Sequence, residues 1–155
     1  MKPQYILVVL AMLAKGALAQ EATAAVEPAP EPVVPPAVLE PIDATGLSLD
    51  AFLWVARPIV VFADTPADPR FQQQLELLLA RPEALADRDV VILIDTDPAA
   101  RSDVRTQLRP RGFSMVLLAK DGTVVLRKPS PWDVREITRA IDKLPLRQDE
   151  IKAGR

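Results

Sequence analysis

The chain has 155 residues, with 19 Lys and Arg against 21 Asp and Glu, a formal net charge of −2 at pH 7, and neither Cys nor His. This length suits a single domain with a tail. Without Cys, the chain by itself cannot carry out thiol redox chemistry, form a disulfide or build a zinc–thiolate site. Without His, it has no Ser-His-Asp triad and no imidazole metal ligand.

Residues 1–19 have the three regions of a secretory signal peptide. Lys2 supplies a positive start, residues 5–14 are apolar, and Ala17-Leu18-Ala19 forms a small–x–small cleavage pattern. We therefore expect an exported protein, periplasmic or secreted after cleavage at about Ala19-Gln20. The apolar run is shorter than the about 20 residues that a membrane span needs, so the mature chain should have no transmembrane segment. An uncleaved anchor is the alternative, because Lys15 lies between the apolar run and the cleavage pattern.

Residues 20–46 form a proline-rich acidic stretch with six prolines, five acidic side chains and no base. Proline at this density blocks helices and sheet ladders, and uncompensated charge favours an extended chain. This composition predicts a disordered linker, which is either a spacer or a bare N-terminal extension. Residues 47–155 remain as the folded domain, and their charge is almost balanced.

The first half of the domain shows two apolar runs that are typical of buried strands, at residues 59–62 and 90–94. Ser48 can cap a short helix before the first run. Asp68-Pro69 is a helix start with Asp as N-cap and Pro at the first helical position. The helix that follows has an apolar stripe formed by Phe71, Leu75, Leu78 and Leu79.

The second half begins with another helix start, Asp97-Pro98, followed by Ala100, Val104 and Leu108 on the inward face. Two strands, at residues 113–118 and 123–126, flank the hairpin turn Lys120-Asp121-Gly122. Ser130-Pro131 then predicts the start of a C-terminal helix with Val134, Ile137, Ile141 and Leu144 on one face.

The resulting order is helix-β-α-β-α-β-β-α. Two parallel strands joined by a right-handed crossover, with an antiparallel hairpin and a closing helix, predict an α/β three-layer sandwich with a mixed four-stranded sheet.

Residues 111–122 resemble the thioredoxin stretch in which a cis-proline precedes the third strand and a Lys-Asx-Gly turn follows. Ser114 stands where that proline would be. Residues 64–70 occupy the place of the redox Cys-x-x-Cys and contain neither cysteine. The resemblance implies a thioredoxin-like fold without Cys-x-x-Cys or cis-Pro.

Residues 47–152 are similar to a thioredoxin/peroxiredoxin-like family of unknown function, found in bacterial exported proteins and in vertebrate matrix proteins of the coiled-coil-domain and sushi-repeat type. The family usually carries Met at positions 144 and 146, where this chain has Leu. The resemblance implies a location outside the cytoplasm, and it implies no established reaction. The matching motifs are Trp54-x-x-Arg57-Pro58, Asp68-x-Arg70-x-x-x-Gln74-Leu75, Arg88-Asp89, Leu118-x-Lys120-Asp121-Gly122 and Ile141-Asp142-x-x-Pro145-x-Arg147-x-x-Glu150.

Four carboxylates follow the two predicted parallel strands: Asp64, Asp68, Asp95 and Asp97. If the strands are neighbours, these side chains approach one another at the sheet edge where α/β folds place ligands. Oxygen ligands suit Mg²⁺ or Ca²⁺, which would support metal-assisted hydrolysis. Alternatively, Asp68 and Asp97 are simple N-caps, and we favour that interpretation because a Pro follows each.

The loop at residues 64–70 precedes a helix N-terminus, where free N–H groups attract anions. Thr65 and Arg70 could add a hydroxyl and a guanidinium to a small anion pocket, although Asp64 and Asp68 would repel its ligand. The alternative is an ordinary capped turn with Arg70 in solvent or paired to Asp64.

Arginines at helical spacing form a candidate basic stripe of Arg101, Arg105 and Arg109, with Arg111 just beyond. Like charges at that spacing destabilise a helix slightly, so the stripe could reflect an acidic partner. A solvated helix face is the simpler interpretation. Nucleic acid is not an expected partner, because the domain lacks a net basic charge and stacking aromatics.

Further candidates lie beside the strands, at the hairpin and near the C-terminus. Arg57 and Arg127 flank strands and could form buried or partner-facing ion pairs. Arg147 could fold back to pair with a core carboxylate. The candidate ligand- or partner-binding residues are thus Arg57, Asp64, Thr65, Asp68, Arg70, Lys120, Asp121, Arg127 and Arg147.

Together these features predict a non-catalytic binding module without a cofactor, whose partner is a protein or a small anionic ligand. A metal-assisted hydrolase using the Asp cluster is the first alternative. An envelope structural or assembly protein is the second.

Overall fold

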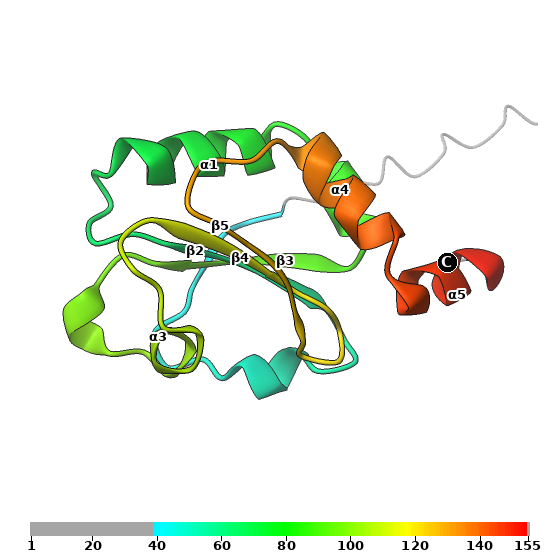
Figure 1. Cartoon of the computed structure of the whole chain (residues 1–155), viewed down its shortest axis with the longest axis horizontal. Coiled ribbons are helices and arrows are strands. Elements are labelled where there is room, and N and C mark those ends of the chain that lie inside the picture. Colours follow the sequence, from blue (N-terminus) through cyan, green and yellow to red (C-terminus); the bar gives the residue numbers. More distant parts are fainter. Residues whose placement is uncertain (1–38, 155) are drawn as a thin grey trace, which may run out of the picture. The chain divides into compact units, whose positions relative to one another are not determined.

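A computed structural model describes residues 39–154, which form one five-stranded mixed sheet with helices on both faces (Figure 1). The predicted signal peptide and most of the predicted linker lie outside these residues. Within the described part of the chain, no helix has the length and apolar character needed to cross a membrane. The strands are β1 (Ile42–Asp43), β2 (Arg57–Phe62), β3 (Val90–Asp95), β4 (Ser114–Leu118) and β5 (Val124–Lys128).

The strands lie in the order β1-β3-β2-β4-β5. β3 pairs in parallel with both β1 and β2, while β2–β4 and β4–β5 are antiparallel. At the centre, Ile59 lies between Ile92 of β3 and Leu117 of β4. The predicted parallel pair and antiparallel hairpin are both present.

Two 3₁₀ turns and five α-helices connect and cover the strands. Asp68 caps α1 as predicted, because its side chain accepts a hydrogen bond from the Arg70 N–H and Pro69 takes the first helical position. Ser48 caps η1 in the same way. The helical elements are η1 (Leu49–Phe52), α1 (Pro69–Leu79), α2 (Pro82–Ala86), η2 (Pro98–Ala100), α3 (Asp103–Leu108), α4 (Val134–Asp142) and α5 (Pro145–Lys152).

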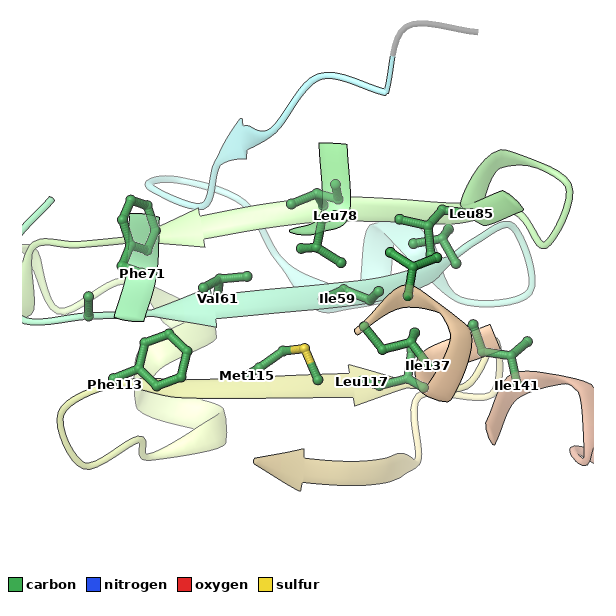
Figure 2. Packing of buried hydrophobic residues seen from close by; sticks show 14 residues of the cluster. Ile59, Val61, Phe71, Leu78, Leu85, Phe113, Met115, Leu117, Ile137 and Ile141 are labelled. Atoms are coloured by element: carbon green, nitrogen blue, oxygen red, sulfur yellow. The ribbon is translucent and has the colours of Figure 1, made fainter. Parts of the chain in front are cut away.

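The central strand β2 divides the core between two apolar clusters. Ile59 and Val61 pack in the cluster that contains α1 and α4 residues (Figure 2). Val60 and Phe62 pack in the other cluster, with η1 and α3 residues. All four side chains are fully buried, as expected for a continuous apolar strand with helices on both faces.

The sheet has a fifth strand that the sequence analysis missed. β1 lies within the stretch that we expected to be linker as far as residue 46. Ile42 pairs with Leu93, and the Ala44 N–H donates to the Ile94 carbonyl at 2.8 Å. Ala44 is fully buried. A two-residue edge strand directly after Pro41 has too little apolar alternation to be found from pattern.

The helix expected after Asp97-Pro98 is broken in two. Arg101 adopts a left-handed conformation (φ 46°) that ends η2, and Ser102 then caps α3 through a hydrogen bond from the Arg105 N–H. Ala100, expected to face inward, is exposed as a result. Val104 of α3 is fully buried, as predicted.

Other boundaries and faces also differ from the prediction. The closing helix begins at Val134 with Asp133 as cap, not at Ser130-Pro131, and ends at Asp142, before Leu144. The two short helices α2 and α5 were not predicted. On α1, Leu79 was expected to face inward but is 43% exposed, and Gln74 is buried. The Gln74 side chain is satisfied in the core because it accepts from the Trp132 N–H at 2.8 Å and donates to the Trp132 C=O at 3.0 Å.

Candidate functional site

The loop after β2, residues 64–70, is hydrogen-bonded largely to itself. Thr65 Oγ1 accepts from the Ala67 N–H at 3.3 Å, and Asp68 binds both the backbone N–H and the guanidinium of Arg70. The hydrogen bond from the Arg70 side chain lowers the pKa of Asp68. Arg70 thus pairs with Asp68 at 3.0 Å, not with Asp64. A paired guanidinium and an occupied helix N-terminus leave this loop little attraction for an anion.

The structure does not gather the four carboxylates proposed as metal ligands. Asp95 is buried and accepts hydrogen bonds from Ser102 and Arg105, while Asp97 caps η2 through the Ala99 N–H at 2.9 Å. Among residues 39–154, no group of three or more acidic side chains is arranged to hold a metal ion.

The predicted basic stripe is divided between the core and the surface. Arg105 turns inward, where its guanidinium pairs with Asp95 at 2.7 Å, donates to the Ala63 carbonyl and lies over the Phe62 ring. Arg105 thereby ties the ends of β2 and β3 to α3. The spacing of arginines along a helix could not show that one of them serves the core.

Three other arginines surround a cavity of about 470 Å³. Arg109 and Arg111 lie in the turn after α3, and Arg127 projects from β5. Phe113 and Ser114 also line this cavity. The cavity therefore lies beside the end of β2, where Ser114 pairs with Phe62.

The three arginine side chains around this cavity have no internal counter-ion. Within residues 39–154, none of Arg109, Arg111 and Arg127 forms an ion pair or a side-chain hydrogen bond. An acidic side chain does lie near the same turn, since the Asp64 carboxylate is 3.8 Å from the place where a Cβ on Gly112 would stand. Cations held together without partners repel one another, and an anion relieves that repulsion.

A second charged cluster lies at the opposite end of β2 and is centred on Glu150. Arg57, which is fully buried, contacts both Glu150 carboxylate oxygens at 3.0 Å. Lys120 and Arg147 pair with the same carboxylate at 2.8 and 3.3 Å. Burial alone raises the pKa of Glu150, but the hydrogen bonds from Lys120 and Arg57 outweigh it and lower the pKa to about 2.

A neighbouring pair extends this cluster. Arg88 donates two hydrogen bonds to Asp142, at 2.8 and 2.7 Å, and this contact lowers the pKa of Asp142. Asp142 also lies 3.7 Å from Arg147. Lys120 further pairs with Asp89 at 2.7 Å. Asp142 of α4 and Glu150 of α5 are thus bonded to the start of β2, the α2–β3 turn and the hairpin.

A family model, "Domain of unknown function (DUF4174)", matches residues 48–150. The chain belongs to the DUF4174 family. No curated protein matches its sequence.

Among solved structures, the DUF4174 chain is similar to chloroplastic thioredoxin z, with 20% identity over 68% of this chain and 95% of that chain, and a TM-score of 0.52. This likeness shows the thioredoxin-like fold. A mutant thioredoxin from Halobacterium salinarum matches at 22% identity, with 68% and 90% of the two chains covered and a TM-score of 0.49. A thioredoxin from Thermus thermophilus matches at 20% identity, with 76% and 91% covered and a TM-score of 0.46.

Four of the five motifs quoted from the sequence contribute residues to the Glu150 cluster and its neighbouring pair, whereas the Asp68–Leu75 motif lies at α1. Arg57, Lys120 and Arg147 were predicted as candidates, and the structure brings all three together. Asp121 does not join them; it accepts hydrogen bonds from Thr123 within the hairpin. Sequence reasoning missed Glu150 as the shared acceptor, although the spacing of Arg147 and Glu150 on one helix was the available signal.

Proposed function

We propose that this DUF4174 chain is an exported, non-redox binding module that holds an anionic ligand or an acidic protein segment in the cavity formed by Arg109, Arg111 and Arg127. The absence of Cys from the sequence supports a role other than thiol exchange. The signal-peptide pattern of residues 1–19 supports export.

The observation that carries the proposal is the set of three arginines without counter-ions around one cavity. Arg109, Arg111 and Arg127 are exposed, whereas buried Arg57 and partly buried Arg105 are matched by acids, Glu150 and Asp95. Guanidinium groups bind carboxylates and phosphates through paired N–H donors, and partly enclosed sites strengthen such bonds. A ligand with several carboxylates therefore suits this cavity best.

Calorimetric titration of the full chain with citrate and with tetraglutamate tests this binding. We expect both probes to bind, and added salt to weaken them because the contacts are ionic. Arg127→Gln should weaken binding about tenfold or more, since a hydrogen bond to a charged group contributes about 1.5–3 kcal/mol. Arg81→Gln, an exposed arginine on α2's N-terminal side, is the matched control. Equal binding by Arg127→Gln and the unmodified chain would contradict the proposal.

Export is tested separately, by expressing the full chain in a bacterium and measuring the mass of the protein in the periplasmic fraction. We expect a product that begins at about Gln20. An intact N-terminus confined to the cytosol would refute export without affecting the binding proposal.

A further inference from the structure

Trp54 is held in a conformation that exposes its indole. Its side chain is 69% exposed, and its φ of 62° lies in the left-handed region that bulky residues rarely adopt. The strained backbone is fixed by a hydrogen bond from the Trp54 N–H to the Lys120 carbonyl at 2.7 Å. A strained, exposed aromatic side chain held by a neighbouring hairpin is a feature that points toward binding.

The indole borders a second cavity, of about 230 Å³, which lies at the start of β2. The arginine cavity lies at the other end of this strand, so the two sites are separate. One wall of the second cavity is the hairpin after β4. Another is the junction between α4 and α5, where Leu144, Pro145 and Leu146 supply apolar surface. Figure 1 shows α5 following α4 at this end of the sheet.

Lys120 gives this cavity one hydrogen-bond donor without an acceptor. Arg57 also lines it, but the Arg57 Nε–H is fully buried, so a ligand in the cavity does not reach that donor. Lys120 Nζ can donate three hydrogen bonds and uses two, to Asp89 and Glu150. Both cations are already neutralised by these acids, so the cavity does not favour an anion. It favours an uncharged hydrogen-bond acceptor.

We propose that this cavity, the Trp54 site, binds a proline-rich peptide segment in an extended conformation. A proline-rich segment offers backbone carbonyls that can accept from Lys120, and its prolines have no N–H that would need an acceptor in return. Pyrrolidine rings pack on an exposed indole, as proline-rich segments pack in aromatic-lined grooves. Asp121 also lines the cavity, but its Oδ1 already accepts from Thr123.

Decaproline is the probe, added to the full chain carrying Trp132→Phe so that Trp54 is the remaining tryptophan reporter. We expect a saturable blue shift of Trp54 emission and no shift with a glycine-serine peptide of equal length. By calorimetry, Trp54→Ala should abolish decaproline binding. Val55→Ala is the matched control, because Val55 is 68% exposed next to Trp54 and does not line the cavity.

Three outcomes would overturn the Trp54 site: no saturable shift at millimolar decaproline, an equal response to the glycine-serine peptide, or a shift with phosphatidylcholine vesicles and not with decaproline. The last would indicate a lipid-contacting indole. Arg127→Gln should leave decaproline binding unchanged, so failure here and failure of the arginine cavity are distinguishable.

Discussion

Glu150→Gln removes the charge at the centre of the Glu150 cluster while keeping the side chain's size. The lowering of the Glu150 pKa from 4.5 to about 2 corresponds to about 3 kcal/mol of preference for the charged form, at about 1.4 kcal/mol per pKa unit. Loss of the carboxylate also leaves Arg57, which is fully buried, without its ion-pair partner. We expect the free energy of unfolding at pH 7 to fall by about 3 kcal/mol.

The effect of pH follows from the direction of the same shift. A carboxyl group whose pKa is lower in the folded state stabilises the fold above its unfolded pKa and loses this contribution as pH falls. The difference between Glu150→Gln and the unmodified chain should therefore be constant above about pH 5. It should shrink between pH 4.5 and about 2.

Urea denaturation of the full chain, followed by tryptophan fluorescence at pH 7, 5, 3 and 2, measures this difference. Asp149→Asn is the matched control on the same helix, because Asp149 is exposed and pairs only with exposed Lys152 at 3.4 Å; it should change stability by less than about 0.5 kcal/mol. If Glu150→Gln costs no more than Asp149→Asn, the Glu150 cluster does not stabilise the fold as argued.

Three further substitutions test the packing that positions the sites, each by the same urea denaturation at pH 7. Leu78→Ala removes a fully buried side chain and should cost about 2–5 kcal/mol; a cost below about 1 kcal/mol would contradict the assigned core. Gln74→Ala leaves the backbone groups of Trp132 without their partner and should cost about 1–3 kcal/mol, whereas no change would show that water replaces the amide. Gly122→Ala should cost about 1 kcal/mol or more, because Gly122 has φ +84° and a Cβ would lie 2.9 Å from Leu53; unchanged stability would exclude that turn conformation.

The sequence was most informative where one local signal decides the structure. Continuous apolar runs predicted β2 and β3, because a strand covered on both faces has no polar side. Asp68-Pro69 located the start of α1 for an equally local reason. The Lys120-Asp121-Gly122 turn predicted the hairpin, since Gly122 supplies the positive φ.

The features that sequence reasoning missed depend on contacts between distant segments. β1 forms by pairing with the edge of β3. The buried residues of α5 are Arg147 and Glu150, so its sequence has no apolar stripe that would predict a helix. The Arg105 side chain points inward because it pairs with buried Asp95, which lies on β3. Which charged residues pair across the chain depends on the fold, so a single sequence does not show these pairs.

At the candidate site, too, the sequence indicated single residues but not how they come together. Arg127 was singled out because it flanks a strand, and Arg109 and Arg111 because they extend a basic stripe. They line one cavity because the fold brings the turn after α3 beside β5, and these two segments are apart in the sequence. The loop at residues 64–70 attracted attention by its place in the fold, yet Arg70 is paired with Asp68.

Chemical-shift mapping with citrate tests whether the arginine cavity binds anions. Citrate would be titrated into the isotopically labelled full chain while backbone amide and arginine side-chain signals are recorded. We predict saturable shifts at residues 109–114 and at Arg127, with the loop at residues 64–70 and Trp54 unaffected. Shifts centred on that loop, or no saturable shift at millimolar citrate, would contradict anion binding in the arginine cavity.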